Sequence, residues 1–95
     1  MIAMRESKTL LSNKLSQLWY QGCVAFERWE LLSWYGKDRI TAVVWRDIEE
    51  NWMAFFPNGD APPLGVIKCD DSTTPQKYFV LNTSAVFPLE TLTKN

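Results

Sequence analysis

Apolar residues recur at helical spacing through the first third of the chain. The segment 7–20 is predicted to form an amphipathic helix, because apolar residues repeat every three or four positions and polar residues fill the other side. The apolar side carries Leu11, Leu15, Leu18 and Trp19. The same series continues past Gly22 as far as residue 32, and Gly36 is well placed to end a second helical segment. The pattern therefore predicts one interrupted or two separate helices before Gly36.

The segment 37–56 fits two templates. As a helix, it presents an apolar residue at every fourth position: Ile40, Val44, Ile48, Trp52 and Phe56. As a β-hairpin, it has a run of β-branched and aromatic residues at 40–45, a loop at 49–51 and a second apolar run at 52–56. The hairpin is the favoured interpretation, because β-branched residues disfavour helix and because 52–56 leads into the turn sequence 57–60.

Strand signals dominate the rest of the chain. Residues 64–69 and 77–82 are predicted to pair as antiparallel strands, because both are apolar-rich runs and a polar loop joins them. Residues 85–89 are expected to add an edge segment or to pack across an open end of the fold. Pro88 disfavours a central strand at that point, because it cannot donate a ladder hydrogen bond.

Together these elements predict one α+β domain that spans residues 1–95, with frayed ends at 1–6 and 91–95. In the favoured architecture, N-terminal helical segments pack on a small antiparallel β-meander. In the alternative architecture, 37–56 is a third helix and is followed by the hairpin 64–82. That order of elements resembles the winged helix-turn-helix of many small transcription regulators, although the resemblance includes no sequence motif.

The winged-helix resemblance implies a DNA-binding surface of basic residues. Lys37, Arg39 and Arg46 are then the candidates for contact with phosphates or base edges, and Lys77 on the wing is the candidate for contact with the backbone. The charge pattern weighs against this alternative. The formal net charge is −1, and three acidic residues at 47–50 share the same segment with the basic ones.

Catalytic chemistry has little support in the sequence. The chain contains no histidine, and so no Ser-His or Cys-His pair. Cys23 and Cys69 lie in no zinc-like spacing, and we expect both to be buried free thiols. The expected protein is not an enzyme and holds no cofactor and no metal. No apolar run reaches the length of a signal peptide or a membrane span, so a cytoplasmic protein without membrane contact is expected.

All five tryptophans fall between residues 19 and 52. Large aromatic side chains are enriched both in the cores of small domains and at binding hot spots. The candidates for a partner-binding surface are Trp34, Tyr35, Trp45 and Trp52. The favoured hypothesis is therefore a small interaction module, such as an adaptor, an accessory subunit or an inhibitor encoded by a phage or mobile element. Its partner is another protein or, in the simplest form, a second copy in a homodimer.

Overall fold

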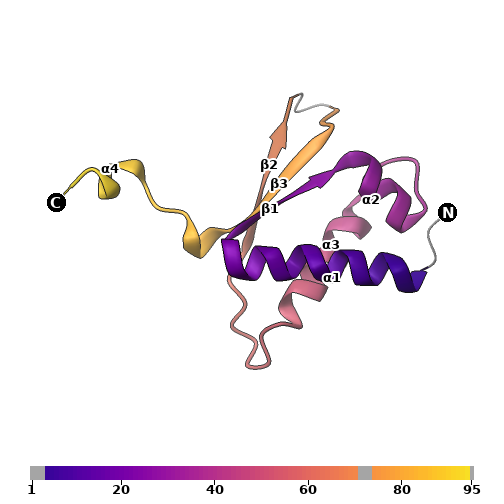
Figure 1. Ribbon diagram of the computed structural model, residues 1–95, viewed down its shortest axis with the longest axis horizontal. Coiled ribbons are helices and arrows are strands. Elements are labelled where there is room, and N and C mark those ends of the chain that lie inside the picture. The colour runs from indigo at the N-terminus through magenta and orange to yellow at the C-terminus, as the bar shows by residue number, and fades with distance from the viewer. Residues whose placement is uncertain (1–3, 71–73, 95) are drawn as a thin grey trace.

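The fold is an α+β arrangement, as predicted, in which helices lie mostly N-terminal to a three-stranded antiparallel sheet (Figure 1). The computed structural model describes residues 4–70 and 74–94, so part of the predicted fraying, at 1–3 and 95, lies outside it. The elements in chain order are α1 (Met4–Gln21), β1 (Cys23–Glu27), α2 (Arg28–Tyr35), α3 (Ala42–Met53), β2 (Leu64–Cys69), β3 (Lys77–Asn82), the 3₁₀ helix η1 (Thr83–Ala85) and α4 (Leu89–Leu92). Within the described ranges, no helix has the length and apolar character needed to cross a membrane.

Helix α1 buries one apolar side, as its spacing predicts. Leu11, Leu15 and Leu18 are at most 5% exposed and belong to the core. The helix ends at Gly22, whose φ of +83° is a left-handed conformation that other residues rarely adopt. The Gly22 N–H donates to the Leu18 carbonyl at 2.9 Å, which closes the last turn of the helix. Gly22 therefore redirects the chain at the point where the apolar series continues.

Residues 23–27 form strand β1, so a helix that continues through these residues is wrong, whereas the prediction of two separate helices before Gly36 is confirmed. Val24 and Phe26 are buried and alternate with more exposed neighbours, which is the period of two of a strand. The strand pairs antiparallel with β3, and Val24 lies opposite Val80. The prediction failed because Phe26 and Trp29 also fit helical spacing, and because so short a strand supplies only two buried positions.

Helix α2 is short, and local interactions fix both of its ends. At its start, Glu27 and Glu30 form a capping box, in which the Glu27 N–H donates to Glu30 Oε1 at 2.9 Å. At its end, Gly36 adopts a left-handed φ of +61°, and the Lys37 N–H donates to the Leu32 carbonyl at 3.0 Å. The predicted helix stop at Gly36 is confirmed.

Residues 42–53 form helix α3, so the β-hairpin interpretation of 37–56 is wrong and the helical alternative is confirmed. Val44, Ile48 and Trp52 are only 0%, 2% and 1% exposed. Burying each such side chain contributes about 1.5–3 kcal/mol, whereas a β-branched residue costs a helix at most about 0.7 kcal/mol relative to alanine. The buried helical stripe therefore outweighs the local preference for strand.

Strands β2 and β3 form the predicted hairpin, and β3 is the central strand in the sheet order β1-β3-β2. The inner face of the sheet carries Val24, Phe26, Tyr78 and Val80, which complete the core together with the helices. Three helices followed by a β-hairpin give the element order of the winged helix-turn-helix alternative, with strand β1 inserted after the first helix.

Residues 83–94 leave the body of the molecule as an extension that contains η1 and α4 (Figure 1). We call this extension the C-terminal arm. The segment 85–89, predicted to add an edge segment or to cover an open end, does not join the sheet and is exposed. The segment is exposed although its side chains are mostly apolar.

Candidate nucleic-acid interface

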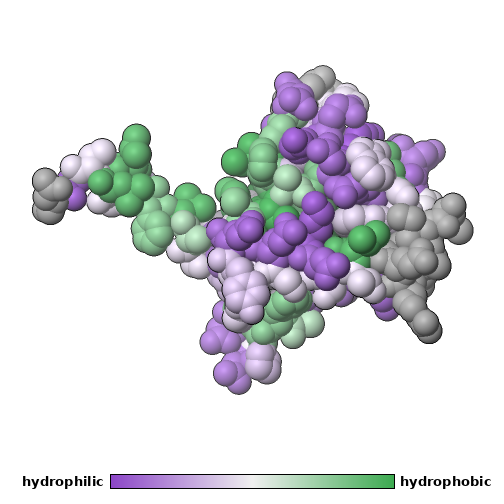
Figure 2. Space-filling view, in the orientation of Figure 1, coloured by the Kyte–Doolittle hydropathy of each residue, from purple (hydrophilic) through white to green (hydrophobic). Residues whose placement is uncertain are grey.

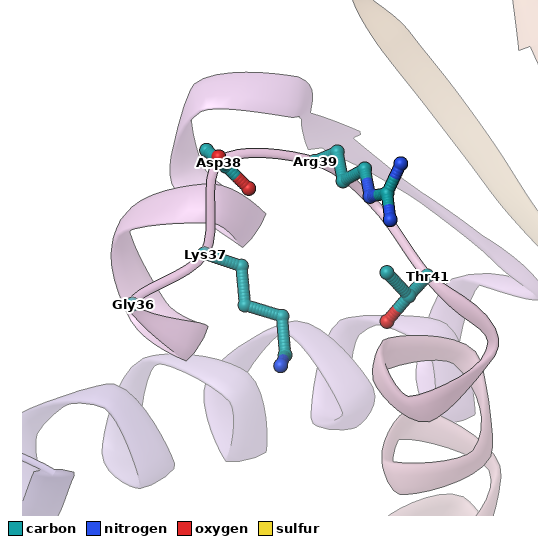
Figure 3. Close-up of a pocket in the computed structure, with 5 residues that line it drawn as sticks. All are labelled: Gly36, Lys37, Asp38, Arg39 and Thr41. Carbon is teal, nitrogen blue, oxygen red and sulfur yellow. The ribbon is translucent and has the colours of Figure 1, made fainter.

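A hollow of about 650 Å³ lies at the connection between α2 and α3. The residues that line it are Gly36, Lys37, Asp38, Arg39 and Thr41 (Figure 3). In Figure 3 the Lys37 side chain extends into the hollow from the end of α2, and Thr41 lies across from it at the start of α3. The hollow therefore lies beside the N-terminus of α3, which is the positive end of the helix dipole.

Thr41 is the N-cap residue of α3. Its backbone is extended, but its side chain makes no capping hydrogen bond. Its Oγ1 is buried and has no hydrogen-bond partner in the part of the chain that the structure describes. The first N–H groups of any helix also lack intrahelical acceptors, so they are free to bind an anion. The start of α3 thus supplies backbone N–H donors beside Lys37 and Arg39, and Asp38 also lines this hollow.

A second hollow, of about 250 Å³, lies between the start of α2, the α2–α3 connection and the β2–β3 hairpin. Three of the side chains that line it are cations from different elements: Arg28, Arg39 and Lys68. The other residues that line it are Ile40, Trp45, Thr74, Pro75 and Tyr78. None of these described lining residues is acidic. We call this hollow the basic cavity.

Backbone pairing brings Arg28 and Lys68 together, although they are far apart in the sequence. The Arg28 N–H donates to the Gln76 carbonyl at 2.9 Å, which ties the start of α2 to the chain entering β3. On the other side of β3, Lys68 lies opposite Tyr78. Because β3 lies between β1 and β2, the sheet holds both cations at the same end of its inner face.

The carboxylates nearest to Arg28 in the sequence are engaged with other cations. Glu27 pairs with Lys77 at 3.5 Å, and Glu30 pairs with Lys14 at 3.9 Å. These two are the ion pairs found among the described residues, and neither of them includes a cation of the basic cavity. Uncompensated positive charge in a concave site attracts anions, because the low-dielectric walls focus its field.

Aromatic side chains give the basic cavity a rigid wall. Trp45 and Tyr78 pack edge to face, with ring centroids 5.0 Å apart and an interplanar angle of 77°.

A hydrogen bond connects α2 to α3, since the Tyr35 hydroxyl donates to Asp47 Oδ2 at 2.6 Å. This hydrogen bond joins the end of α2 to the middle of α3.

Tyr35→Phe is expected to lower the free energy of unfolding by about 1–2 kcal/mol at neutral pH, because the half-buried Asp47 carboxylate loses a donor. Burial, the hydrogen bond to Asp47 and the Asp47 charge all raise the pKa of Tyr35 above its ordinary value of 10.0. Above that pH the unfolded chain releases the Tyr35 proton while the folded chain keeps it, so stability falls as pH rises further. Urea unfolding at neutral and alkaline pH checks this. The variant should lose less stability at alkaline pH than the wild type, and an equal loss would contradict the assignment.

The basic residues predicted for DNA contact do not all lie together. Lys37 and Arg39 line the hollow at the α2–α3 connection, and Arg39 also lines the basic cavity. Arg46 is exposed on α3 but lines neither hollow. Lys77 lies on the outer face of the sheet in an ion pair with a glutamate, away from the basic cavity.

Two cations of the basic cavity, Arg28 and Lys68, were missed by the sequence analysis. Lys68 could have been found from the sequence. In the predicted strand it lies two and four residues after Val66 and Leu64, so all three share the inner face, and Lys68 places a charge there. Arg28 has no such signal, because residues 23–32 fit a helix and hide the strand that positions it.

The aromatic residues predicted for a protein partner are wholly or partly buried. Trp52 is 1% exposed, and its indole N–H donates to the Pro62 carbonyl at 3.0 Å. Trp34, Tyr35 and Trp45 are half-buried and pack against the core. The exposed tryptophans are instead Trp19 and Trp29, at 46% and 66%.

The cysteines also depart from expectation. Both are free thiols, but neither is buried, because Cys23 is exposed on the outer face of β1 and Cys69 is half-exposed at the end of β2. Throughout the ranges that the structure describes, no three potential metal ligands of the His, Cys, Asp or Glu type cluster together.

No protein-family model matches this chain, and neither a curated protein nor a solved structure is similar to it. What the site binds is therefore inferred from its geometry and charge.

Proposed function

We propose that the chain is a winged-helix DNA-binding protein that holds the backbone of double-stranded DNA at the basic cavity. The observation that carries this proposal is the convergence of Arg28, Arg39 and Lys68 on one concave site whose described lining includes no acidic residue. Guanidinium and ammonium groups are the usual partners of phosphate. The elements around the cavity are those that a helix-turn-helix protein presents to a duplex.

The extent of the basic surface favours a polyanion over a small anion. Arg39 links the basic cavity to the neighbouring hollow, where Lys37 adds a further cation and Asp38 is the acidic residue of the described lining. A row of cations matches successive phosphates, which place one charge on about every 3.4 Å of the axis along each strand of duplex DNA. Trp45 and Tyr78 pack edge to face within the wall and Tyr78 is buried, so the pair is not an exposed platform of parallel ring faces on which successive single-stranded bases would stack.

The charges on the second half of α3 favour contacts with the DNA backbone over insertion of the whole helix into the major groove. Glu49 and Glu50 are exposed there and would approach phosphates if the whole helix entered the groove. We therefore place only the first turns of α3, with exposed Val43 and Arg46, next to the duplex. Phosphate contacts then supply most of the affinity, and sequence preference is weak.

Fluorescence anisotropy with a labelled duplex of about 20 base pairs tests this function. Three phosphate contacts predict a slope of about −2.7 for the logarithm of the association constant against that of salt concentration, or about a 40-fold loss between about 50 and 200 mM salt. The same sequence as a single strand is expected to bind more weakly. Absence of duplex binding at low salt, or binding independent of salt, would overturn the proposal.

A further inference from the structure

The C-terminal arm carries apolar side chains that its own chain does not cover. Four of the seven residues from 86 to 92 are large and apolar, and they are 56–74% exposed: Val86, Phe87, Leu89 and Leu92. Contiguous apolar side chains of this kind are uncommon on the free surface of a monomer, and they mark interaction sites.

The base of the arm is fixed in a direction that leads away from the body. The Asn82 N–H donates to the Gly22 carbonyl at 2.9 Å, and the Asn82 side chain accepts from the Ser84 N–H at 2.9 Å and from its hydroxyl at 2.6 Å. The Thr83 N–H and hydroxyl both donate to the Pro63 carbonyl, at 3.1 and 2.7 Å. These bonds fix the direction in which the arm leaves, and the arm runs away from the sheet and the helices (Figure 1).

The outer face of the sheet is an apolar surface of matching character. Its central row consists of Ala25, Phe79 and Ile67, which lie opposite one another on β1, β3 and β2. Phe79 is 37% exposed and Ile67 is 50% exposed, because the core and its helices lie on the opposite face. Cys23 and Leu81 extend this row toward the base of the arm.

We propose a twofold-symmetric dimer in which the arm of each copy lies across the outer sheet face of the other copy. Figure 2 shows apolar residues along the arm and on the side of the body from which the arm leaves. In a twofold-symmetric pair each copy supplies an arm to the other copy's sheet, so the same two surfaces are buried on both sides. This is the simplest form of the protein-binding hypothesis drawn from the sequence.

The area available is sufficient for a stable dimer. At about 80 Å² of apolar area for each of the four arm side chains, two exchanged arms and the two faces that they cover bury about 1,300 Å². Specific and stable interfaces begin at about 1,200 Å². The dimer uses the outer face of the sheet, whereas Lys68 and Tyr78 of the basic cavity belong to the inner side, so self-association and DNA binding succeed or fail separately.

Sedimentation equilibrium of the full chain, at about 1–100 µM, tests the exchange of arms. The wild type is expected to dimerise in this range. Phe87→Asp combined with Leu89→Asp on the arm, and separately Ile67→Asp on the sheet, are each expected to raise the dimer dissociation constant at least about 100-fold, because each buries a charge in the interface. Circular dichroism confirms that the variants remain folded.

Thr91→Asp combined with Thr93→Asp is the matched control, because it adds the same two charges to the arm without removing an apolar side chain. This variant should dimerise like the wild type. A wild-type chain that stays monomeric at about 100 µM overturns the proposal. The proposal is also overturned if the arm variants weaken the dimer but Ile67→Asp does not, since the arm would then lie on some other surface.

Discussion

Replacing the three cations of the basic cavity together, with Arg28→Gln, Arg39→Gln and Lys68→Gln, is expected to weaken binding of duplex DNA roughly 100-fold or more at about 50 mM salt. Glutamine keeps much of the length and polarity of each side chain while removing its charge. Each lost phosphate contact should also take about 0.9 from the salt slope, so the slope should become shallower by about 2.7 and only the dependence from contacts outside the cavity should remain. Anisotropy titrations of the variant at several salt concentrations measure both quantities.

A charge-matched control separates the basic cavity from the overall charge of the protein. Lys8→Gln, Lys77→Gln and Lys94→Gln remove the same number of positive charges from residues that do not line the cavity. This control is expected to bind duplex DNA within about threefold of the wild type, because these charges lie outside the cavity and interactions between surface charges are screened over about 10 Å. If both triple variants lose affinity equally, net charge explains the binding and the basic cavity does not.

Trp52→Ala is expected to cause the largest loss of stability of any single substitution discussed above. Trp52 is 1% exposed, and its ring packs against Trp19 and Phe56 with centroids 6.3 and 4.9 Å away. The cavity left by alanine costs about 3–5 kcal/mol, and the Pro62 carbonyl loses its donor as well. For a domain of this size, that loss corresponds to a fall in melting temperature of about 15–30 °C.

Trp29→Ala provides the comparison, since it removes the same side chain from a position that is 66% exposed. Its effect on the free energy of unfolding should stay below about 1 kcal/mol, as is usual for surface substitutions. Thermal unfolding followed by circular dichroism measures both variants. Equal losses in the two would mean that Trp52 is not the centre of the core.

The prediction of the fold succeeded where one periodicity alone fitted the sequence. Helix α1 and the β2–β3 hairpin have unambiguous patterns, and both are present. Segment 37–56 satisfied two periodicities, and local β propensity favoured the wrong one. Only the burial of Val44, Ile48 and Trp52 together decides for helix, and burial is a property of the assembled core. Strand β1 was missed for the same reason, because its alternation becomes visible only beside its partner β3.

The candidate site was only partly predictable. Arg39 was selected as part of the predicted third helix 37–56, whereas the structure places it in the connection before α3, where it lines both hollows. Lys77 was selected because it lies on the wing, but strand parity places it on the outer face. Arg28 and Lys68 meet only through pairing with β3, and sequence spacing contains no information about that juxtaposition.

The central position of β3 also determines the order in which the chain can fold. Strands β1 and β2 each pair with β3 and not with each other, so no sheet exists until residues 77–82 are available. The pairing of β1 with β3 joins segments that are far apart in sequence. Such contacts form slowly, because the entropic cost of closing the intervening loop comes before the contacts stabilise the fold. On the ribosome, α1, β1, α2 and α3 are made before the strand that completes their core. Until then, Val24 and Phe26 lack their β3 neighbours Val80 and Tyr78, and the incomplete core exposes apolar surface to chaperones and to other unfinished chains.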